Sequence, residues 1–207
     1  LALLLLLIGG VGSYFTLSQS YQEEISSEKK VSSYMVEEIQ ISADNASVEV
    51  LPTSDTETKV QLVTKGVDVS KLDFTAEVEG KKLMIRLKDK STFYIGFNIQ
   101  SSHLYVYVPQ KLYHSIVIDN DNGKVKMSEL NVKNLNVQTD NGRIELNKIV
   151  SENVDVRSAN GKLNLNEVEG NIKGSSNNGK ILLATKDLDR NIQLESNNGK
   201  ISIKTEK

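Results

Sequence analysis

The sequence predicts an all-β protein whose repeated part is a single-stranded parallel β-solenoid, or β-helix, with coils of about 19 residues. The first observation is that apolar and polar residues alternate from residue 36 onward, which is typical of strands with one buried face. The second is an Asn-Gly turn that recurs, with Lys or Arg after it and an alternating apolar segment beyond. The turn glycines are spaced 19, 19, 18 and 20 residues apart: Gly123, Gly142, Gly161, Gly179 and Gly199.

An N-terminal transmembrane helix is expected to precede the solenoid. Residues 1–17 are apolar and uncharged, and they begin without Met or a basic segment. Because a membrane span needs about 20 apolar residues, we expect an anchor that is truncated at its start. The small residues at Ser18-Gln19-Ser20 leave a cleaved signal peptide open as the alternative. Either reading predicts export, and the anchor predicts a single-pass cell-membrane protein with an extracytoplasmic repeat domain.

The rest of the chain divides into a linker and a repeat domain. Residues 18–35 are polar, Ser-rich and mixed in charge, which predicts a juxtamembrane linker. Residues 36–207 are expected to form the solenoid. The segment 38–50 fits the repeat with Asn45-Ala46 in place of Asn-Gly, and residues 55–113 are interpreted as larger coils of the same stack.

A meander of antiparallel hairpins is the alternative architecture, because Asn-Gly is also a favoured hairpin turn. The meander would need a second turn of constant composition at half the period. The sequence has no such turn, and all length variation falls in the other connection of each repeat. Stacked coils are therefore favoured, although the sequence leaves their handedness open.

Composition excludes several classes of protein. Lys and Arg number 25 and Asp and Glu 27, which gives a formal charge of −2 and argues against electrostatic nucleic-acid binding. The chain has no cysteine, so thiol catalysis, disulfides and Cys-based zinc sites are excluded. With two histidines, His103 and His114, and no hydrolase motif, we expect no catalytic residues, no metal and no cofactor.

Two further chemistries are weaker alternatives. The acidic run 119–123 lacks the ligand spacing of a calcium loop and is interpreted as the cap of the first coil. Some carbohydrate-active enzymes work with carboxylates alone. Asp121, Asp140 and Arg143 therefore keep a polysaccharide-acting enzyme as a remote alternative.

A strand closing on Pro109, followed by repeated [DN]-N-G-[KR] units, resembles the putative-adhesin family of bacterial β-strand repeat proteins. The resemblance covers roughly residues 36–207. Together with the apolar N-terminus, it is similar to the membrane-anchored members encoded with Gram-positive cell-envelope stress-response systems. The resemblance implies a β-solenoid outside the membrane and implies no reaction, since the domain has no known function.

The turn residues are expected to have a structural role. The asparagines should form a ladder in which tolerance of positive φ and amide-to-amide hydrogen bonds hold the corner. Recognition of a glycan is the alternative role. The structural turn residues are Asn122, Gly123, Asn141, Gly142, Asn160, Gly161, Asn178, Gly179, Asn198 and Gly199.

The residue after each turn glycine is basic: Lys124, Arg143, Lys162, Lys180 and Lys200. Strand alternation turns these side chains to solvent, so the stack would line them up over about 20 Å. Carboxylates lie near this row only in the early coils, at Glu145, Asp121 and Asp140. The row predicts a binding site for a polyanion such as a teichoic-acid chain or anionic lipid headgroups. Lysines that deter edge-to-edge aggregation are the alternative.

Three tyrosines form a possible aromatic contact surface: Tyr94, Tyr105 and Tyr107. Tyr105 and Tyr107 alternate with Leu104 and Val106, so they occupy the face opposite those apolar residues. They are predicted either to contact a sugar or a protein partner, or to pack over the wider end of the core.

The predicted function is therefore a non-catalytic binding or scaffold module in cell-envelope stress response or adhesion. Its expected partners are the membrane through the anchor, an anionic cell-wall polymer or lipid headgroups, or an envelope protein, with no nucleic acid. A structural spacer or oligomerisation stack that docks another chain at residues 201–207 is the alternative.

Overall fold

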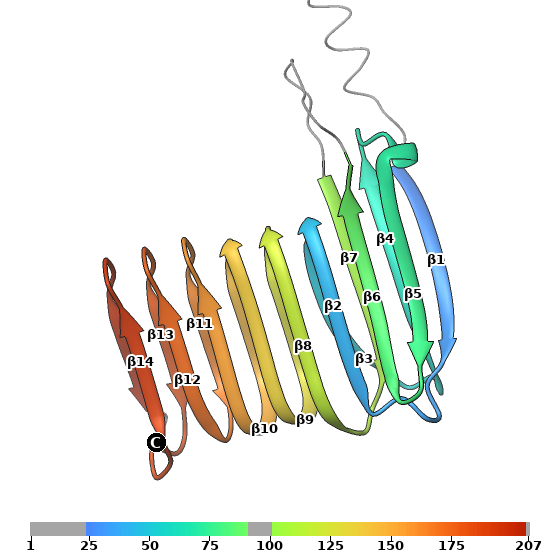
Figure 1. Ribbon diagram of the computed structural model, residues 1–207. Coiled ribbons are helices and arrows are strands. Elements are labelled where there is room, and N and C mark those ends of the chain that lie inside the picture. The colour runs from blue at the N-terminus through green and yellow to red at the C-terminus, as the bar shows by residue number, and fades with distance from the viewer. Residues whose placement is uncertain (1–23, 91–100, 206–207) are drawn as a thin grey trace, which may run out of the picture.

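The computed structural model describes residues 24–90 and 101–205, which form β-strands and one short 3-10 helix, η1 (Val69–Lys71) (Figure 1). The strands are β1 (Glu24–Ser32), β2 (Glu38–Asn45), β3 (Ser47–Thr53), β4 (Glu57–Lys65), β5 (Leu72–Glu79), β6 (Lys82–Asp89), β7 (Ser101–Pro109), β8 (Leu112–Asn122), β9 (Val125–Asn141), β10 (Ile144–Ser158), β11 (Leu163–Val168), β12 (Asn171–Ser176), β13 (Ile181–Thr185), β14 (Ile192–Ser196) and β15 (Ile201–Thr205).

The strands line up in two faces that enclose the core between them. The first face runs β5, β6, β2, β8, the second halves of β9 and β10, β12 and β14. The second face runs β1, β4, β7, β3, the first halves of β9 and β10, β11, β13 and β15. The chain passes from the first face to the second at each Asn-Gly corner, which lies between strands. It returns from the second face to the first where β9 and β10 bend, near Glu129 and Lys148, so these two strands belong to both faces.

The repeated coils stack in parallel and in register, as the sequence predicts. On the first face, Ile116 pairs with Leu135, which pairs with Val154. On the second face, the equivalent positions of successive coils pair in the same way from Val125 through Ile144 onward. The all-β, solenoid-like fold is therefore confirmed, and the parallel pairing rules out a hairpin meander for this part of the chain.

The segment 38–50 forms a coil of the stack, as its fit to the repeat predicts. Ile39 pairs with Ile116 on the first face, and Val48 pairs with Val125 on the second. Asn45 pairs with Asn122 at the corner, although the two residues lie 77 positions apart in the sequence. The first coil of the stack is thus separated from the second by all of β4 to β7.

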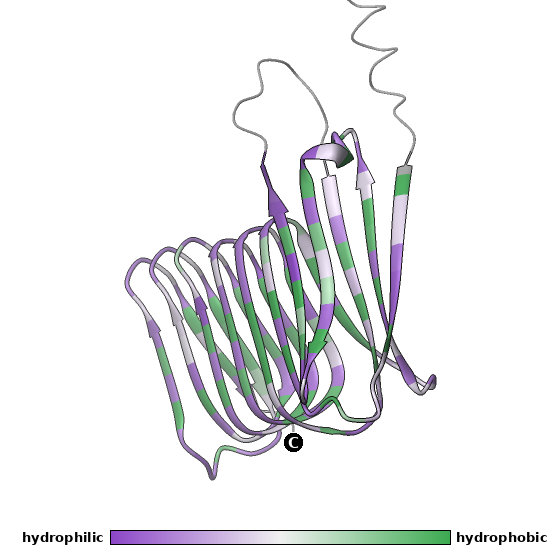
Figure 2. Cartoon of the chain, turned by 45° about the vertical axis from the view of Figure 1, so that its right-hand side comes forward, coloured by the Kyte–Doolittle hydropathy of each residue, from purple (hydrophilic) through white to green (hydrophobic). Residues whose placement is uncertain are grey.

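The core lies between the faces, where the inward side chains of every coil meet. Ile116, Val125, Val137 and Ile144 are all 0% exposed. The outward residues between them are mostly polar, so hydropathy alternates along most strands (Figure 2). Burial of each such side chain contributes roughly 1.5–3 kcal/mol to folding, which makes this alternation the main source of the coil's stability.

The interpretation of residues 55–113 as larger coils is wrong for β4 and β5, whereas β6 and β7 do stack in parallel on β2 and β3. β4 is antiparallel to β1 and to β7, and β5 is antiparallel to β6. Only Gly80 and Lys81 separate β5 from β6, and Gly80 has φ of +60°. A two-residue connection can join antiparallel strands but is far too short for a parallel crossover.

The predicted linker also differs from the structure over residues 24–32, which form β1 along the edge of the second face. Val31 of this strand packs against the core, so even a strand rich in Ser and Lys supplies an inward apolar side chain. The expected anchor and the start of the linker, residues 1–23, lie outside the described residues, as does Tyr94. Within the described ranges, no helix has the length and apolar character to span a membrane.

Candidate binding surfaces

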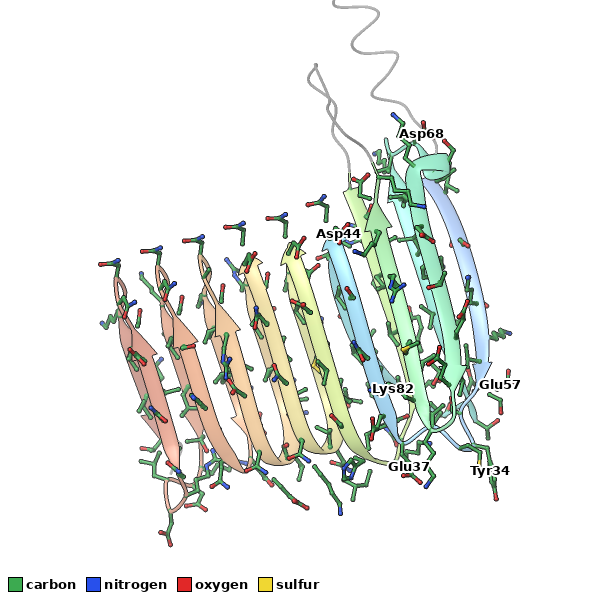
Figure 3. All side chains as sticks on the ribbon, viewed as in Figure 1. Tyr34, Glu37, Asp44, Glu57, Asp68 and Lys82 are labelled. Carbon is green, nitrogen blue, oxygen red and sulfur yellow. The ribbon has the colours of Figure 1, made fainter. Side chains whose placement is uncertain are left out.

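The corner asparagines form the predicted ladder. The Asn141 side-chain N–H donates to Asn122 Oδ1 at 2.9 Å, and Asn160 donates to Asn141 at 2.9 Å. The series continues to Asn178 and Asn198 at 2.8 and 2.9 Å, and it starts one coil earlier, where Asn122 donates to Asn45 at 2.8 Å. In Figure 3 a regular row of side chains stands above the corners, beginning near the labelled Asp44.

The reason for the Asn-Gly sequence is different from the one predicted. Among the described residues, positive φ at a non-glycine occurs at Glu129, Lys148 and Glu167, and not at the corner asparagines. A Cβ added at Gly161 would lie 1.6 Å from the carbonyl oxygen of Gly142, and one at Gly142 would lie 1.8 Å from that of Gly123. Glycine is therefore needed because successive corners approach too closely for a side chain.

A second, buried ladder lies beneath the corners and was missed in the sequence. Ser158 Oγ donates to the carbonyl of Gly142 at 3.0 Å, and Ser176 Oγ donates to Gly161 at 2.9 Å. Ser196 repeats the contact to Gly179 at 2.8 Å. The signal was present, because each hydroxyl stands three residues before a turn glycine. These bonds satisfy the corner carbonyls, which would otherwise be left unpaired.

The basic side chains form a row on the second face, here called the cation row: Lys124, Arg143, Lys162, Lys180 and Lys200. Backbone hydrogen bonds fix its register, since Val125 N donates to Arg143 O at 2.9 Å and Ile144 N to Lys162 O at 3.0 Å. The same contact recurs at Lys180 and Lys200, both at 2.9 Å.

The two ends of the cation row differ in whether the basic side chains have a carboxylate partner. Lys124 Nζ lies 2.6 Å from a Glu145 carboxylate oxygen and Arg143 lies 3.4 Å from the other. Burial raises the pKa of Glu145, but the hydrogen bond and charge of Lys124 and the contact with Arg143 outweigh it, so that the pKa is lowered. Across the described ranges, no carboxylate oxygen lies within 4.0 Å of Lys162, Lys180 or Lys200.

The predicted tyrosines extend this face toward β7. His103, Tyr105 and Tyr107, here called the aromatic row, have ring centroids 6.1 and 6.4 Å apart and interplanar angles of 14° and 21°. Lys59 Nζ stands 4.5 Å from the centre of the Tyr107 ring. Leu104 and Val106 are buried on the opposite side of β7, as the alternation predicts.

The aromatic and cation rows meet at a small hollow of about 100 Å³, lined in part by His103, Tyr105, Glu49 and Lys124. Lys126 also lines this hollow, and its Nζ lies 2.6 Å from a Glu49 carboxylate oxygen. The hydrogen bond with Glu49 raises the pKa of Lys126. The structure thus joins two sequence predictions into one continuous surface. A cationic strip bordered by half-buried rings can hold an anionic chain with ring or aliphatic groups.

The residues of the enzyme alternative are not brought together as a catalytic pair with Arg143. Asp121 stacks between Asp44 and Asp140 at the end of the first face, whereas Arg143 contacts Glu145 on the second. Burial raises the pKa of Asp121, and the charges of Asp44, Asp140 and Asp119 raise it further. The described part of the chain holds no group of three His, Cys, Asp or Glu residues placed to bind a metal ion.

A larger hollow crosses the start of the strands on the first face. It has a volume of about 460 Å³ and spans five coils, from Ser115 to Asn191. Its amide side chains are Asn134, Asn136, Asn153, Asn171, Asn191 and Gln193. We call it the amide groove. Asparagine recurs eight residues before four of the turn glycines, but the recurrence alone did not indicate a groove.

Comparison with solved structures finds similar folds in bacterial proteins. A protein from Clostridium sporogenes described as a putative cell adhesion protein is 14% identical, with a TM-score of 0.60 over 89% of this chain and 100% of that one. A putative adhesin from Bacteroides fragilis is 15% identical, with a TM-score of 0.42 over 89% of this chain and 98% of that one. No curated protein matches the chain.

The family comparison covers most of the sequence. The family model described as Toastrack DUF4097 matches residues 36–207, which include the coils, the cation row and the amide groove. The chain therefore belongs to the Toastrack family, DUF4097.

Proposed function

We propose that the chain is a non-catalytic binding module of the bacterial cell envelope, tethered to the membrane through residues 1–17, and that its second face holds a phosphate-bearing polyanion. The observation that carries the proposal is the unpaired half of the cation row. Lys162, Lys180 and Lys200 are aligned one coil apart, with no carboxylate partner among the described residues. Their spacing of about 4.8 Å concentrates positive charge that a polymer of phosphodiesters would neutralise.

An adhesion role fits the description of the C. sporogenes protein that shares the fold. A place in an envelope stress response fits the resemblance to membrane-anchored members of such systems. Both roles need a surface that recognises envelope polymer or lipid, and the second face offers a cationic surface next to half-buried aromatic rings. Phosphodiester groups occur both in wall polymers and in lipid headgroups, so the experiment includes both sources.

The test replaces three lysines with glutamine: Lys162→Gln, Lys180→Gln and Lys200→Gln. The full chain in detergent is titrated with soluble poly(glycerol phosphate), and the full chain in neutral vesicles is compared with vesicles containing phosphatidylglycerol. We expect the variant to bind at least one of these probes about tenfold more weakly, because three solvent-exposed charge contacts of about 0.5 kcal/mol each sum to about 1.5 kcal/mol.

The matched control removes the same charge from three exposed lysines elsewhere: Lys65→Gln, Lys88→Gln and Lys186→Gln. It should bind like the wild type. Equal weakening in both variants would mean that net charge alone drives binding, and an unchanged triple variant would remove the cation row from the proposal. Loss of polymer binding with vesicle binding intact would identify wall polymer as the ligand, and the reverse would identify lipid.

A second candidate function, stacking of copies end to end, is favoured by the open end of the solenoid. β14 and β15 each pair with one neighbour, and their other edges meet no strand among the described residues. Ile201 and Ile203 at this end are 38% and 48% exposed. Edges and apolar side chains of this kind are the usual basis of strand addition by another chain.

A further inference from the structure

The amide groove lies on the opposite side of the molecule from the cation row and differs from it in chemistry. Its strands begin near the end of the first face marked by Glu37 and Lys82 in Figure 3. Five coils contribute to it, which gives it a length of about 19 Å at the usual strand spacing. A volume of about 460 Å³ falls within the range of sites for small organic ligands.

The groove has unused hydrogen-bonding capacity. Asn153 donates to Asn134 at 3.1 Å, and Asn171 donates to Asn153 at 3.2 Å. A side-chain amide has two N–H donors and two acceptor positions, so each of these contacts uses only part of it. Asn136 and Gln193 make no side-chain hydrogen bond to any residue in the described ranges. The groove therefore presents donors and acceptors together, repeated from coil to coil.

Its charge is balanced. Asp155 and Lys173 are the charged residues of the lining, and Arg157 already binds Asp155, with Nε donating to Oδ1 at 3.0 Å. Between the amides the lining is apolar, at Val117, which is 37% exposed, and at the edges of the core side chains. A polyanion would find one cation here, so the groove does not duplicate the second face.

We propose that the amide groove binds a neutral oligosaccharide that lies along the stack axis. Sugar hydroxyls both donate and accept hydrogen bonds, as amides do, and the C–H faces of sugar rings pack on apolar surface such as Val117. An elongated ligand matches the shape of the groove, because the same amide positions recur over five coils. This site is separate from the polyanion surface and does not depend on it.

The test uses the full chain in detergent and four probes: chitohexaose, cellohexaose, mannohexaose and, as a charged comparison, polyglutamate. Binding is measured by calorimetry and by shifts of the side-chain amide signals in NMR spectra. The variant is Asn136→Ala with Gln193→Ala, since neither side chain makes a hydrogen bond within the described structure. At least one neutral hexasaccharide should bind, and the variant should bind it about tenfold more weakly because two hydrogen bonds are lost.

The control is Gln138→Ala with Asn131→Ala, two exposed amides outside the groove, which should leave the affinity unchanged. The Lys162, Lys180 and Lys200 triple variant should also bind the sugar normally, so failure of one proposal is distinguishable from failure of the other. Absence of binding to every hexasaccharide in the millimolar range would overturn the inference. Preference for polyglutamate, or a change of oligomeric state in the groove variant instead of its sugar affinity, would overturn it too.

Discussion

A single methyl group is enough to test how closely the corners pack. Gly161→Ala would place a Cβ 1.6 Å from the Gly142 carbonyl oxygen and 2.6 Å from its carbon, which are backbone atoms that cannot turn away. We expect the free energy of unfolding to fall by about 3 kcal/mol or more, because two coils must separate to admit the group. Denaturant unfolding of the purified chain measures this change.

Gly174→Ala is the matched control for that substitution. Its Cβ would meet the end of the Leu194 side chain at 2.8 Å, and a flexible side chain can move. A small effect at Gly174 together with a large one at Gly161 would support backbone crowding. Similar effects at both positions would show that the corners are looser than described.

Asp121 gives a prediction with a defined pH dependence. Burial and the neighbouring charges of Asp44, Asp140 and Asp119 raise its pKa, so the ionised carboxylate destabilises the folded state. Asp121→Asn should therefore increase the free energy of unfolding at pH 7, by about 0.5 kcal/mol or less, since solvent screens an exposed group. The gain should decrease as the pH falls through the raised pKa and vanish below about 3.9, the value for the unfolded chain.

Unfolding at pH 7 and pH 3 measures this difference, with Asp55→Asn as an exposed control. A loss of stability at pH 7 would contradict the account, because it would mean that the carboxylate makes a favourable contact. A gain that persists at pH 3 would point to a contact made by the amide itself.

At the scale of elements, β15 is the strand most open to another chain. Ile203 is 48% exposed, and Ile203→Lys would place a charge where a second copy would pair. If copies stack through this end, the wild type should form dimers or larger species at micromolar concentration and the variant should be monomeric. Light scattering on the full chain in detergent measures this. Ile25→Lys, on the opposite edge strand β1 and 46% exposed in the wild type, is the control.

The repeat elements were predictable because each coil has the same sequence pattern. The spacing of Gly142 and Gly161, with apolar residues at fixed offsets, determines the register in which Ile144 pairs with Leu163. β1 was not predictable in this way, since its sequence is mostly polar and its place depends on pairing with β4. The antiparallel pairing of β5 with β6 depended on one short turn at Gly80, which the solenoid interpretation overlooked.

The candidate sites also differ in how far the sequence predicts them. The cation row follows from strand alternation and coil spacing alone, so its residues were found from the sequence. The division of the row into a paired and an unpaired half was not predicted from the sequence. It depends on the side chains of Lys124 and Arg143 both contacting the carboxylate of Glu145. The amide groove needed the structure, since the recurrence of asparagine does not show where a hollow forms.

At the scale of the whole molecule, the two candidate surfaces lie on opposite faces of one stack. A polymer on the second face leaves the amide groove on the first face open. Because the core between the faces is fully packed, with Val137 and Ile144 both 0% exposed, the two faces are held at a fixed distance. The proposed ligands could therefore be held together by a single rigid protein.

The pairing of segment 38–50 with the coil at 116–127 has a consequence for how the chain acquires its structure. The contacts of Ile39 with Ile116 and of Asn45 with Asn122 form only after more than 70 further residues have been made, so these contacts close a long loop. Each later coil, by contrast, rests on the coil about 19 residues away. Assembly is therefore expected to nucleate in the C-terminal coils and to proceed backward, with the earliest-synthesised strands joining last.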